Sequence, residues 1–180
     1  APTTTCGTAP HIMAGSSASG TYSAVSWSGN PNGSWTSTHP TDPSQWAFTP
    51  STASGSFTST LTLTGAGACI GTNPTVTRVI TWDPEPTVDA GTDLEVCSST
   101  GAITMTGATS SNLSSYTWSN LIPADGTWNQ GGTPASATFT PSSGSGQILA
   151  TLTALGNGAC SSIPTSDSRT LTWHTPPTIN

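Results

Sequence analysis

Hydrophobic and polar residues alternate along two long stretches of the chain. Residues 56–64 read SFTSTLTLT, so Phe57, Leu61 and Leu63 would share one face of an extended segment and the threonines the other. Residues 147–155 read QILATLTAL and alternate in the same way. A period of two is typical of a half-buried β-strand, and no stretch has a convincing helical period. The pattern predicts an all-β chain.

Shorter segments predict two more strands in each half of the chain. Residues 77–82 and 168–173 both contain the pattern R-x-[IL]-T-W, which places an arginine, an aliphatic residue and a tryptophan on one face. Residues 25–27 and 116–118 carry a tryptophan in the middle of a third predicted strand. Residues 29–33 read GNPNG, a composition typical of turns.

These patterns occur twice, because the chain repeats itself with a period of about 91 residues. Cys6 and Cys69 are separated by 63 positions, as are Cys97 and Cys160. The same offset aligns Trp27 with Trp118, Phe48 with Phe139, Leu61 with Leu152, Arg78 with Arg169 and Trp82 with Trp173. Such a period exceeds the 20–50 residues of solenoid repeats and suits one β-sandwich per repeat. We predict two tandem Ig-like or PKD-like β-sandwich domains, residues 1–86 and 87–180.

Four cysteines allow three pairings. The repeat favours Cys6 with Cys69 and Cys97 with Cys160, one disulfide inside each domain. Closing a loop of this length should add about 4 kcal/mol to stability in the chain-entropy model. A metal site is the disfavoured alternative, because no two cysteines are close in sequence and no histidine lies at ligand spacing. Disulfides imply an oxidising, extracellular compartment.

The junction between the predicted domains contains Pro84 and Pro86, which favour a short, semi-rigid linker. Five carboxylates crowd it: Asp83, Glu85, Asp89, Asp93 and Glu95. Solvated linker charge is the default interpretation, and an interdomain Ca²⁺ site is the alternative. The two ends of the sequence, residues 1–6 and 173–180, resemble two halves of one such junction, so we expect a piece of a longer array.

Each repeat resembles the Ig-like or PKD-like modules of giant Bacteroidetes surface proteins, including SprB-like gliding-motility adhesins. The resemblance depends on the order of five motifs in the second repeat: VDAGTDLEVC (Val88–Cys97), YTWS (Tyr116–Ser119), TFTPS (Thr138–Ser142), LTALGNGAC (Leu152–Cys160) and RTLTW (Arg169–Trp173). The first repeat departs by opening with APTTTC. The resemblance implies β-sandwich repeats, export to the cell surface, and service as an adhesin, stalk or fibre without a catalytic site.

Composition narrows the possible partners. Charged residues make up 6% of the chain, lysine is absent, and Arg78 and Arg169 are the only strong cations, so nucleic acid is a poor partner. No apolar run approaches the ~20 residues of a membrane span. The 36 Thr and 28 Ser residues supply polarity instead. The seven tryptophans need burial and argue against disorder.

The aromatic and cationic residues provide candidate sites. We expect Trp27, Trp118, Trp82 and Trp173 to be structural core residues, and Arg78 and Arg169 to lie over aromatic faces or beside acids. Trp35 and Trp128 follow turns and should anchor loops. Trp46 has no counterpart in the second repeat. A carbohydrate-binding module that stacks sugars on Trp46 or Trp35 is therefore the alternative to a structural role.

No glycine-rich phosphate loop, HExxH motif or G-x-S-x-G elbow is present in the sequence, so we expect no enzyme activity, no cofactor and no metal. The expected function is that of a structural segment of a secreted cell-surface adhesin, stalk or fibre. Its expected partners are neighbouring repeats of the same protein, with self-association into fibres, and surface glycans in the alternative interpretation.

Overall fold

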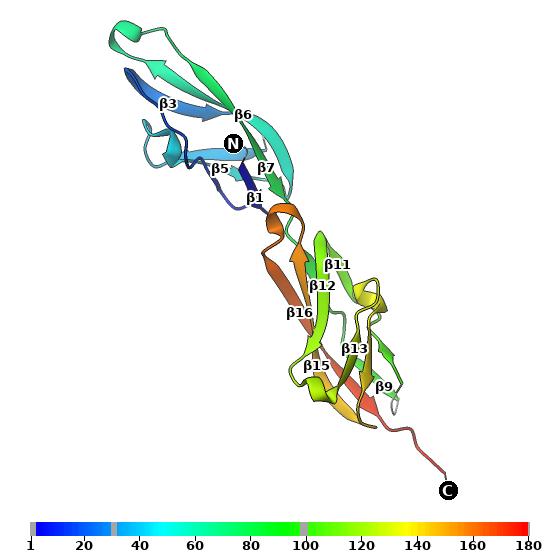
Figure 1. Cartoon of the computed structure of the whole chain (residues 1–180). Coiled ribbons are helices and arrows are strands. Elements are labelled where there is room, and N and C mark those ends of the chain that lie inside the picture. Colours follow the sequence, from blue (N-terminus) through cyan, green and yellow to red (C-terminus); the bar gives the residue numbers. More distant parts are fainter. Residues whose placement is uncertain (1–2, 30–31, 98–100, 180) are drawn as a thin grey trace. The chain divides into compact units, whose positions relative to one another are not determined.

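The chain is described by a computed structural model that covers residues 3–29, 32–97 and 101–179 (Figure 1). Its contacts divide the chain into two compact units. Unit 1 contains Ala1–Glu85 together with the turn Gly158–Cys160, and unit 2 contains Pro86–Asn157 and Ser161–Asn180. The domain ranges predicted from the repeat, 1–86 and 87–180, stay a prediction. The turn 158–160 falls in the second of these ranges but is assigned to unit 1.

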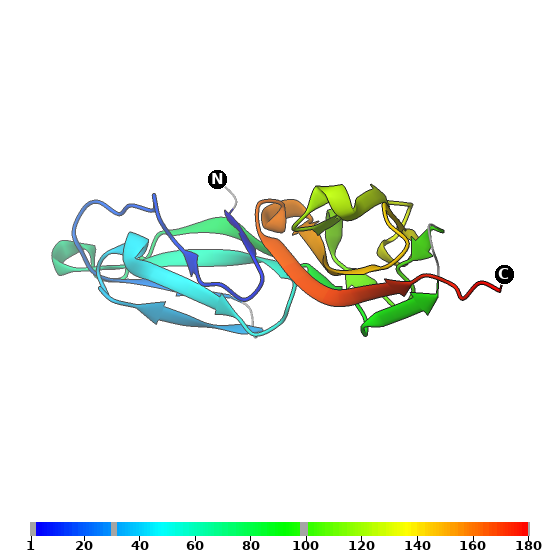
Figure 2. The same cartoon turned by 90° about the horizontal axis from the view of Figure 1, so that it is seen from below.

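Unit 1 is built from two sheets. The first has the strand order β1-β7-β6-β3, and the second has the order β2-β5-β4. The strands are β1 (Thr3–Cys6), β2 (His11–Ile12), β3 (Tyr22–Ser28), β4 (Gly33–Ser37), β5 (Trp46–Pro50), β6 (Gly55–Gly65) and β7 (Thr75–Asp83). In Figure 2 the light-blue strands β4 and β5 lie in a different layer from the turquoise strand β6 and the green strand β7. Short 3₁₀ turns, η1 (Pro43–Gln45) and η2 (Gly67–Cys69), complete the unit.

Unit 2 repeats this plan and adds a two-stranded ribbon. Its sheets have the orders β12-β15-β16-β9, β10-β14-β13 and β11-β8. The strands are β8 (Thr87–Asp89), β9 (Leu94–Cys97), β10 (Ile103–Thr104), β11 (Thr109–Ser111), β12 (Leu113–Asn120), β13 (Gly126–Asn129), β14 (Thr138–Pro141), β15 (Gly146–Gly156) and β16 (Pro164–His174). The 3₁₀ turns η3 (Pro123–Asp125) and η4 (Pro134–Ser136) lie in this unit, and η5 (Gly158–Cys160) packs with unit 1.

The strand registers reproduce the sequence repeat. Trp27 pairs with Leu61 between β3 and β6, and Trp118 pairs with Leu152 between β12 and β15. The predicted strands 56–64 and 147–155 lie within β6 and β15. The prediction of an all-β chain is confirmed, since the regular elements of the described residues are strands and short 3₁₀ turns. In the described part of the chain, no helix has the length and apolar character of a membrane span.

Each unit has its own hydrophobic core. The core of unit 1 consists of Met13, Val25, Trp27, Phe48, Leu61, Ile80 and Trp82. The core of unit 2 includes their repeat counterparts Met105, Trp118, Phe139, Leu152, Leu171 and Trp173. Each core holds a stacked pair of indoles, with ring centroids 5.9 Å apart for Trp27 and Trp35 and 5.7 Å apart for Trp118 and Trp128. The aromatic residues of the repeat are thus packed in the same way twice.

The buried indole nitrogens have equivalent partners in the two units. Trp27 Nε1 donates to the carbonyl of Pro43 and Trp118 Nε1 donates to that of Pro134. A buried polar group without a hydrogen bond costs about 1–3 kcal/mol. These bonds therefore allow an indole to be buried at this position in each core.

Candidate functional site

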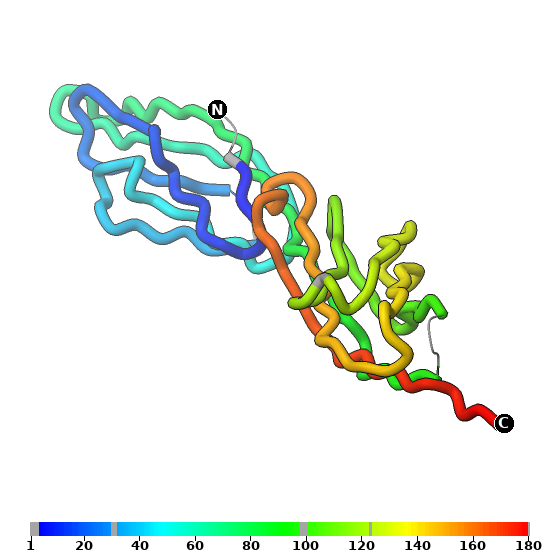
Figure 3. The backbone as a smooth tube through the Cα atoms, turned by 60° about the horizontal axis from the view of Figure 1, so that its bottom comes forward, coloured from blue at the N-terminus to red at the C-terminus, as the bar shows by residue number. Residues whose placement is uncertain are grey.

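A single disulfide is present among the described residues, between Cys6 and Cys160. Its Cα atoms are 4.8 Å apart, within the usual range for disulfides. The two cysteines are 154 positions apart, so the bond joins the first sequence repeat to the second. The turn η5, orange in the tube of Figure 3, is assigned to unit 1, so the bridge lies inside that unit.

The predicted pairing of Cys6 with Cys69 is wrong, and the sheet topology explains why. Cys6 is the last residue of β1, which runs parallel to β7 and places Cys6 opposite Asp83 at the end of that strand. Cys69 lies in the turn before β7 begins at Thr75. The length of β7, about 26 Å at 3.3 Å per residue, separates these two positions. Cysteines whose Cα atoms are more than 7 Å apart cannot be bridged.

The predicted pairing of Cys97 with Cys160 is wrong for the same reason. Cys97 ends β9 and lies opposite His174 at the end of β16, whereas Cys160 precedes the start of β16 at Pro164. The strand between these positions is about 33 Å long. Cys69 and Cys97 are both free and exposed. The prediction of one disulfide inside each domain therefore does not hold.

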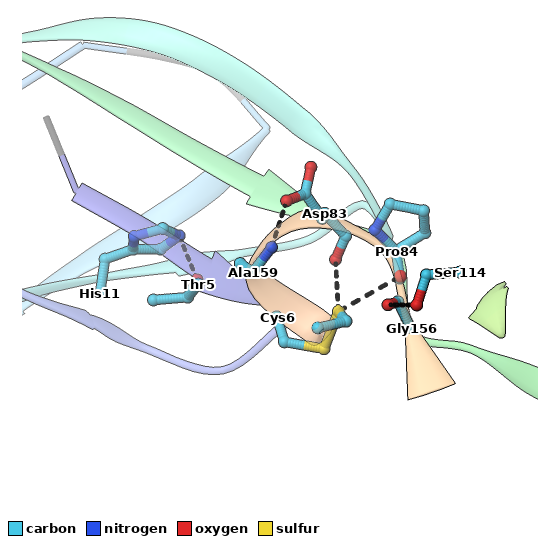
Figure 4. The surroundings of a disulfide bond; sticks show 9 residues. Thr5, Cys6, His11, Asp83, Pro84, Ser114, Gly156 and Ala159 are labelled. Atoms are coloured by element: carbon cyan, nitrogen blue, oxygen red, sulfur yellow. Dashed lines mark hydrogen bonds between the residues drawn. A yellow bond between two sulfur atoms is a disulfide. The ribbon is translucent and has the colours of Figure 1, made fainter. Parts of the chain in front are cut away.

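Asp83 holds the turn η5 against the end of β1. Its Oδ2 atom accepts a hydrogen bond from the backbone amide of Ala159 at 2.8 Å (Figure 4). Its carbonyl accepts a hydrogen bond from the amide of Gly7 at 2.7 Å. The sulfur of Cys160 lies 3.6 Å from the carbonyl oxygen of Asp83 and 3.3 Å from that of Pro84. These last two are contacts, because a disulfide sulfur has no proton to donate.

Glycine is required at the tip of this turn. Gly158 has a φ angle of +54°, and a Cβ atom on it would lie 2.2 Å from Oδ2 of Asp83. Its repeat counterpart Gly67 has nearly the same φ of +58°, but there the nearest neighbouring atom, Cγ2 of Thr21, would be 3.9 Å away. The two turns thus share a backbone conformation, and only the one at Gly158 is packed against a carboxylate.

A buried histidine lies close to the bridge. Nε2 of His11 is 2.6 Å from Oγ1 of Thr5, the residue before Cys6 (Figure 4). Burial lowers the pKa of His11, because removing the ring from water disfavours its charged form. The ring packs edge-on against Trp82 at 6.1 Å. His11 is therefore a neutral packing residue at neutral pH, and Ile103 occupies the equivalent place in unit 2.

The two arginines differ in their surroundings. Arg169 is 3% exposed, lies over the Trp118 ring at 5.6 Å and donates to the carbonyl of Thr106 at 2.8 Å. Burial lowers its pKa, and the nearby carboxylate of Asp93 acts in the opposite direction. Arg78 is only half-buried, and its guanidinium bonds the carbonyl of Ala14 and the hydroxyl of Ser16, each at 3.3 Å.

The junction carboxylates have separate roles in the structure. Asp89 accepts from the amide of Gly91, Asp93 accepts from the amide of Thr170, and Glu95 pairs with His174, at 2.8, 2.8 and 2.7 Å. Within the described ranges no three metal-binding side chains gather at one place. A Ca²⁺ site needs six to eight oxygens around one point, and each of these three carboxylates has a separate hydrogen-bond partner.

The tryptophans proposed as sugar platforms are both half-buried. One face of Trp35 is covered by Trp27, and its other neighbours include Phe48 at 5.2 Å. Trp46 packs against the same core, and its Nε1 is buried with no hydrogen-bond partner among the described residues. The face of Trp35 that stacks on Trp27 is therefore not available to a sugar ring.

No protein-family model matches the sequence, and no curated protein sequence matches it. Similar solved structures include human protocadherin-24 EC1-2, at 10% identity over 86% of this chain and 82% of that chain, with a TM-score of 0.45. Protocadherin gamma B2 cadherin domains 3–6 match at 12% identity over 93% of this chain and 50% of that chain, with a TM-score of 0.37. Extracellular domains 3–5 of Drosophila OTK match at 11% identity over 86% and 57%, with a TM-score of 0.37. All three are repeated extracellular modules.

Proposed function

We propose that this chain is a tension-bearing structural segment of a secreted cell-surface adhesin, stalk or fibre, of the kind used in adhesion and gliding motility, and that it has no enzyme activity. The observation that carries the proposal is the disulfide between Cys6 and Cys160. Disulfides form and persist in oxidising compartments, which supports a location outside the cell.

The disulfide provides a short covalent route through the chain. Tension applied at the two ends passes along residues 1–6, across the sulfur–sulfur bond, and along residues 160–180. Residues 7–159 lie inside the loop that the bond closes, so they cannot be extended even when their hydrogen bonds break. A stalk under load gains from this arrangement, because its length changes little when a unit unfolds.

The surroundings of the bridge also suit a mechanical role. Cys6 ends a four-residue strand that is paired along its whole length with β7. The turn that carries Cys160 is held by the carboxylate of Asp83 and has no room for a side chain at Gly158. The polar groups at this site therefore fix the backbone around the disulfide.

Single-molecule stretching from the two termini tests this function. The oxidised chain should extend only over the residues outside the loop. Reduction should release up to about 500 Å of additional contour, because Cys6 and Cys160 are 154 positions apart and an extended chain spans about 3.4 Å per position. Cys6→Ser should show the long extension without a reductant, and Cys97→Ser should behave like the unchanged chain. Equal extension of the oxidised and reduced chains would refute the proposal.

A further inference from the structure

The two free cysteines are the repeat counterparts of the two bonded ones. Cys69 corresponds to Cys160, and Cys97 corresponds to Cys6, each at an offset of 91 positions. Both free thiols are exposed. An exposed, unpaired cysteine in a secreted protein points to pairing with another chain. The repeat therefore indicates which partner each thiol should have.

The existing bond in unit 1 shows how a GAC turn pairs with the end of a strand. The turns Gly67–Cys69 and Gly158–Cys160 have the same sequence, GAC, and are both single 3₁₀ turns. Their glycines have φ angles of +58° and +54°. The second of these turns packs on the strand end at Cys6. The first has the same backbone and is exposed to solvent.

Unit 2 contains a strand end that is equivalent to the one at Cys6. Cys97 ends β9 in parallel register with β16, as Cys6 ends β1 in parallel register with β7. The two strand ends differ at one position. Asp83 in unit 1 corresponds to His174 in unit 2, and His174 forms an ion pair with Glu95. The Cys97 strand end therefore offers a different polar group to the incoming turn, while the position of the sulfur is retained.

The segment that follows β16 also has a counterpart in the repeat, the segment that contains Val88. In unit 2, Val88 of β8 packs against the core while β8 pairs with β11. By the repeat offset, the counterpart of Val88 is Ile179, which is 100% exposed. Ile179 is thus the residue that would pack against a neighbouring unit as Val88 packs against unit 2.

Unit 1 has a surface pocket where such a segment would pack. The pocket is lined by the loop Ala14–Ser17, by Trp27 and by Arg78. At the equivalent place in unit 2, Gly91 lies against Gly107 and against the guanidinium of Arg169. The segment 88–91 therefore covers the arginine in unit 2, and the pocket beside Arg78 is the place in unit 1 where an equivalent segment would pack.

We propose that copies of this chain join head to tail through a disulfide between Cys97 of one copy and Cys69 of the next. The turn Gly67–Cys69 of the second copy packs on the Cys97 strand end of the first. The segment of the first copy that contains Ile179 packs in the Arg78 pocket of the second. The two surfaces differ, so the interface is heterologous and copies can add one after another. A fibre of covalently joined copies results.

The chemistry of the link is a thiol–disulfide exchange. The thiols of Cys69 and Cys97 together lose two protons and two electrons as the new sulfur–sulfur bond forms. A low-molecular-weight disulfide, such as oxidised glutathione, accepts them and becomes two thiols. The proposal builds on the structural function proposed above. Its failure would leave the Cys6–Cys160 bridge, and hence that function, unaffected.

A complementation experiment tests the linkage. Cys69→Ser retains only the Cys97 thiol, and Cys97→Ser retains only the Cys69 thiol. In a glutathione redox buffer each variant alone should stay monomeric, while an equimolar mixture should give a disulfide-linked dimer and the unchanged chain a ladder on a non-reducing gel. Mass spectrometry should find a linked peptide containing Cys69 and Cys97. Equal dimer formation by either variant alone, or no dimer in the mixture, would overturn the proposal.

The role of the terminal segment is tested by moving one substitution between the two variants. Ile179→Asp in the Cys69→Ser copy, whose terminal segment would enter the pocket, should slow dimer formation in the mixture severalfold. The same substitution in the Cys97→Ser copy, whose terminal segment is not used in the dimer, should leave the rate unchanged. Equal rates for both placements would contradict the docking of this segment, and circular dichroism melts would verify that all variants fold.

Discussion

Replacing Cys6 or Cys160 with serine should lower the free energy of unfolding by about 2–5 kcal/mol, the range found when native disulfides are removed. The bond closes a loop across 154 positions, so its loss restores a large conformational entropy to the unfolded chain. At roughly 4–8 °C per kcal/mol for a unit of this size, the melting temperature should fall by about 10 °C or more. Thermal unfolding followed by circular dichroism measures the change.

The repeat supplies matched controls for this prediction. Cys69→Ser and Cys97→Ser alter the counterpart positions, but both thiols are exposed and unbonded. Substitutions at such surface positions usually change stability by less than about 0.5 kcal/mol. A loss from Cys69→Ser as large as that from Cys6→Ser would show that these two residues are bonded to each other, against the structure.

Arg169→Ala should destabilise the protein by about 2–4 kcal/mol, whereas Arg78→Ala should cost about 1 kcal/mol or less. Arg169 is buried, covers the Trp118 ring and donates to the carbonyl of Thr106. Its removal loses the cation–π contact and leaves a buried acceptor without its donor. Arg78 is half-buried, and its hydrogen bonds are longer, at 3.3 Å. Urea denaturation followed by tryptophan fluorescence compares the two variants.

Equal losses from the two arginine variants would contradict the structural account of unit 2. The sequence gives both arginines the same local motif, R-x-[IL]-T-W. The difference arises from residues 88–93, which cover Arg169 and place Asp93 close to it. Burial of the cation is therefore a consequence of the long-range path of this segment, and the motif alone cannot reveal it.

Local patterns were sufficient to predict the strands. The alternation at residues 56–64 and 147–155 separates an apolar face from a polar face, and each of these stretches lies within a strand of the structure. The offset of 91 positions also holds in the strand registers, as the pairs Trp27–Leu61 and Trp118–Leu152 show. Side-chain alternation is a local property, so it can be read from a single sequence.

The disulfide could not be derived in the same way. A spacing of 63 between cysteines in both repeats is equally consistent with bonds inside a repeat and with bonds shifted to the next repeat. The deciding fact is that β1 runs parallel to β7, which takes Cys6 to the end of β7 far from Cys69. Parallel pairing joins segments distant in sequence and leaves no local signature. The duplicated GAC turn was the available clue that Cys69 and Cys160 have the same local role.

Disulfide mapping of the freshly purified monomer identifies which cysteines are bonded. Free thiols are alkylated first, and the protein is then digested with pepsin at acid pH, where thiol–disulfide exchange is slow because few thiols are ionised. We expect one linked peptide pair containing Cys6 and Cys160, with the alkyl label on Cys69 and Cys97 only. Peptide pairs joining Cys6 to Cys69 and Cys97 to Cys160, with no label incorporated, would contradict it.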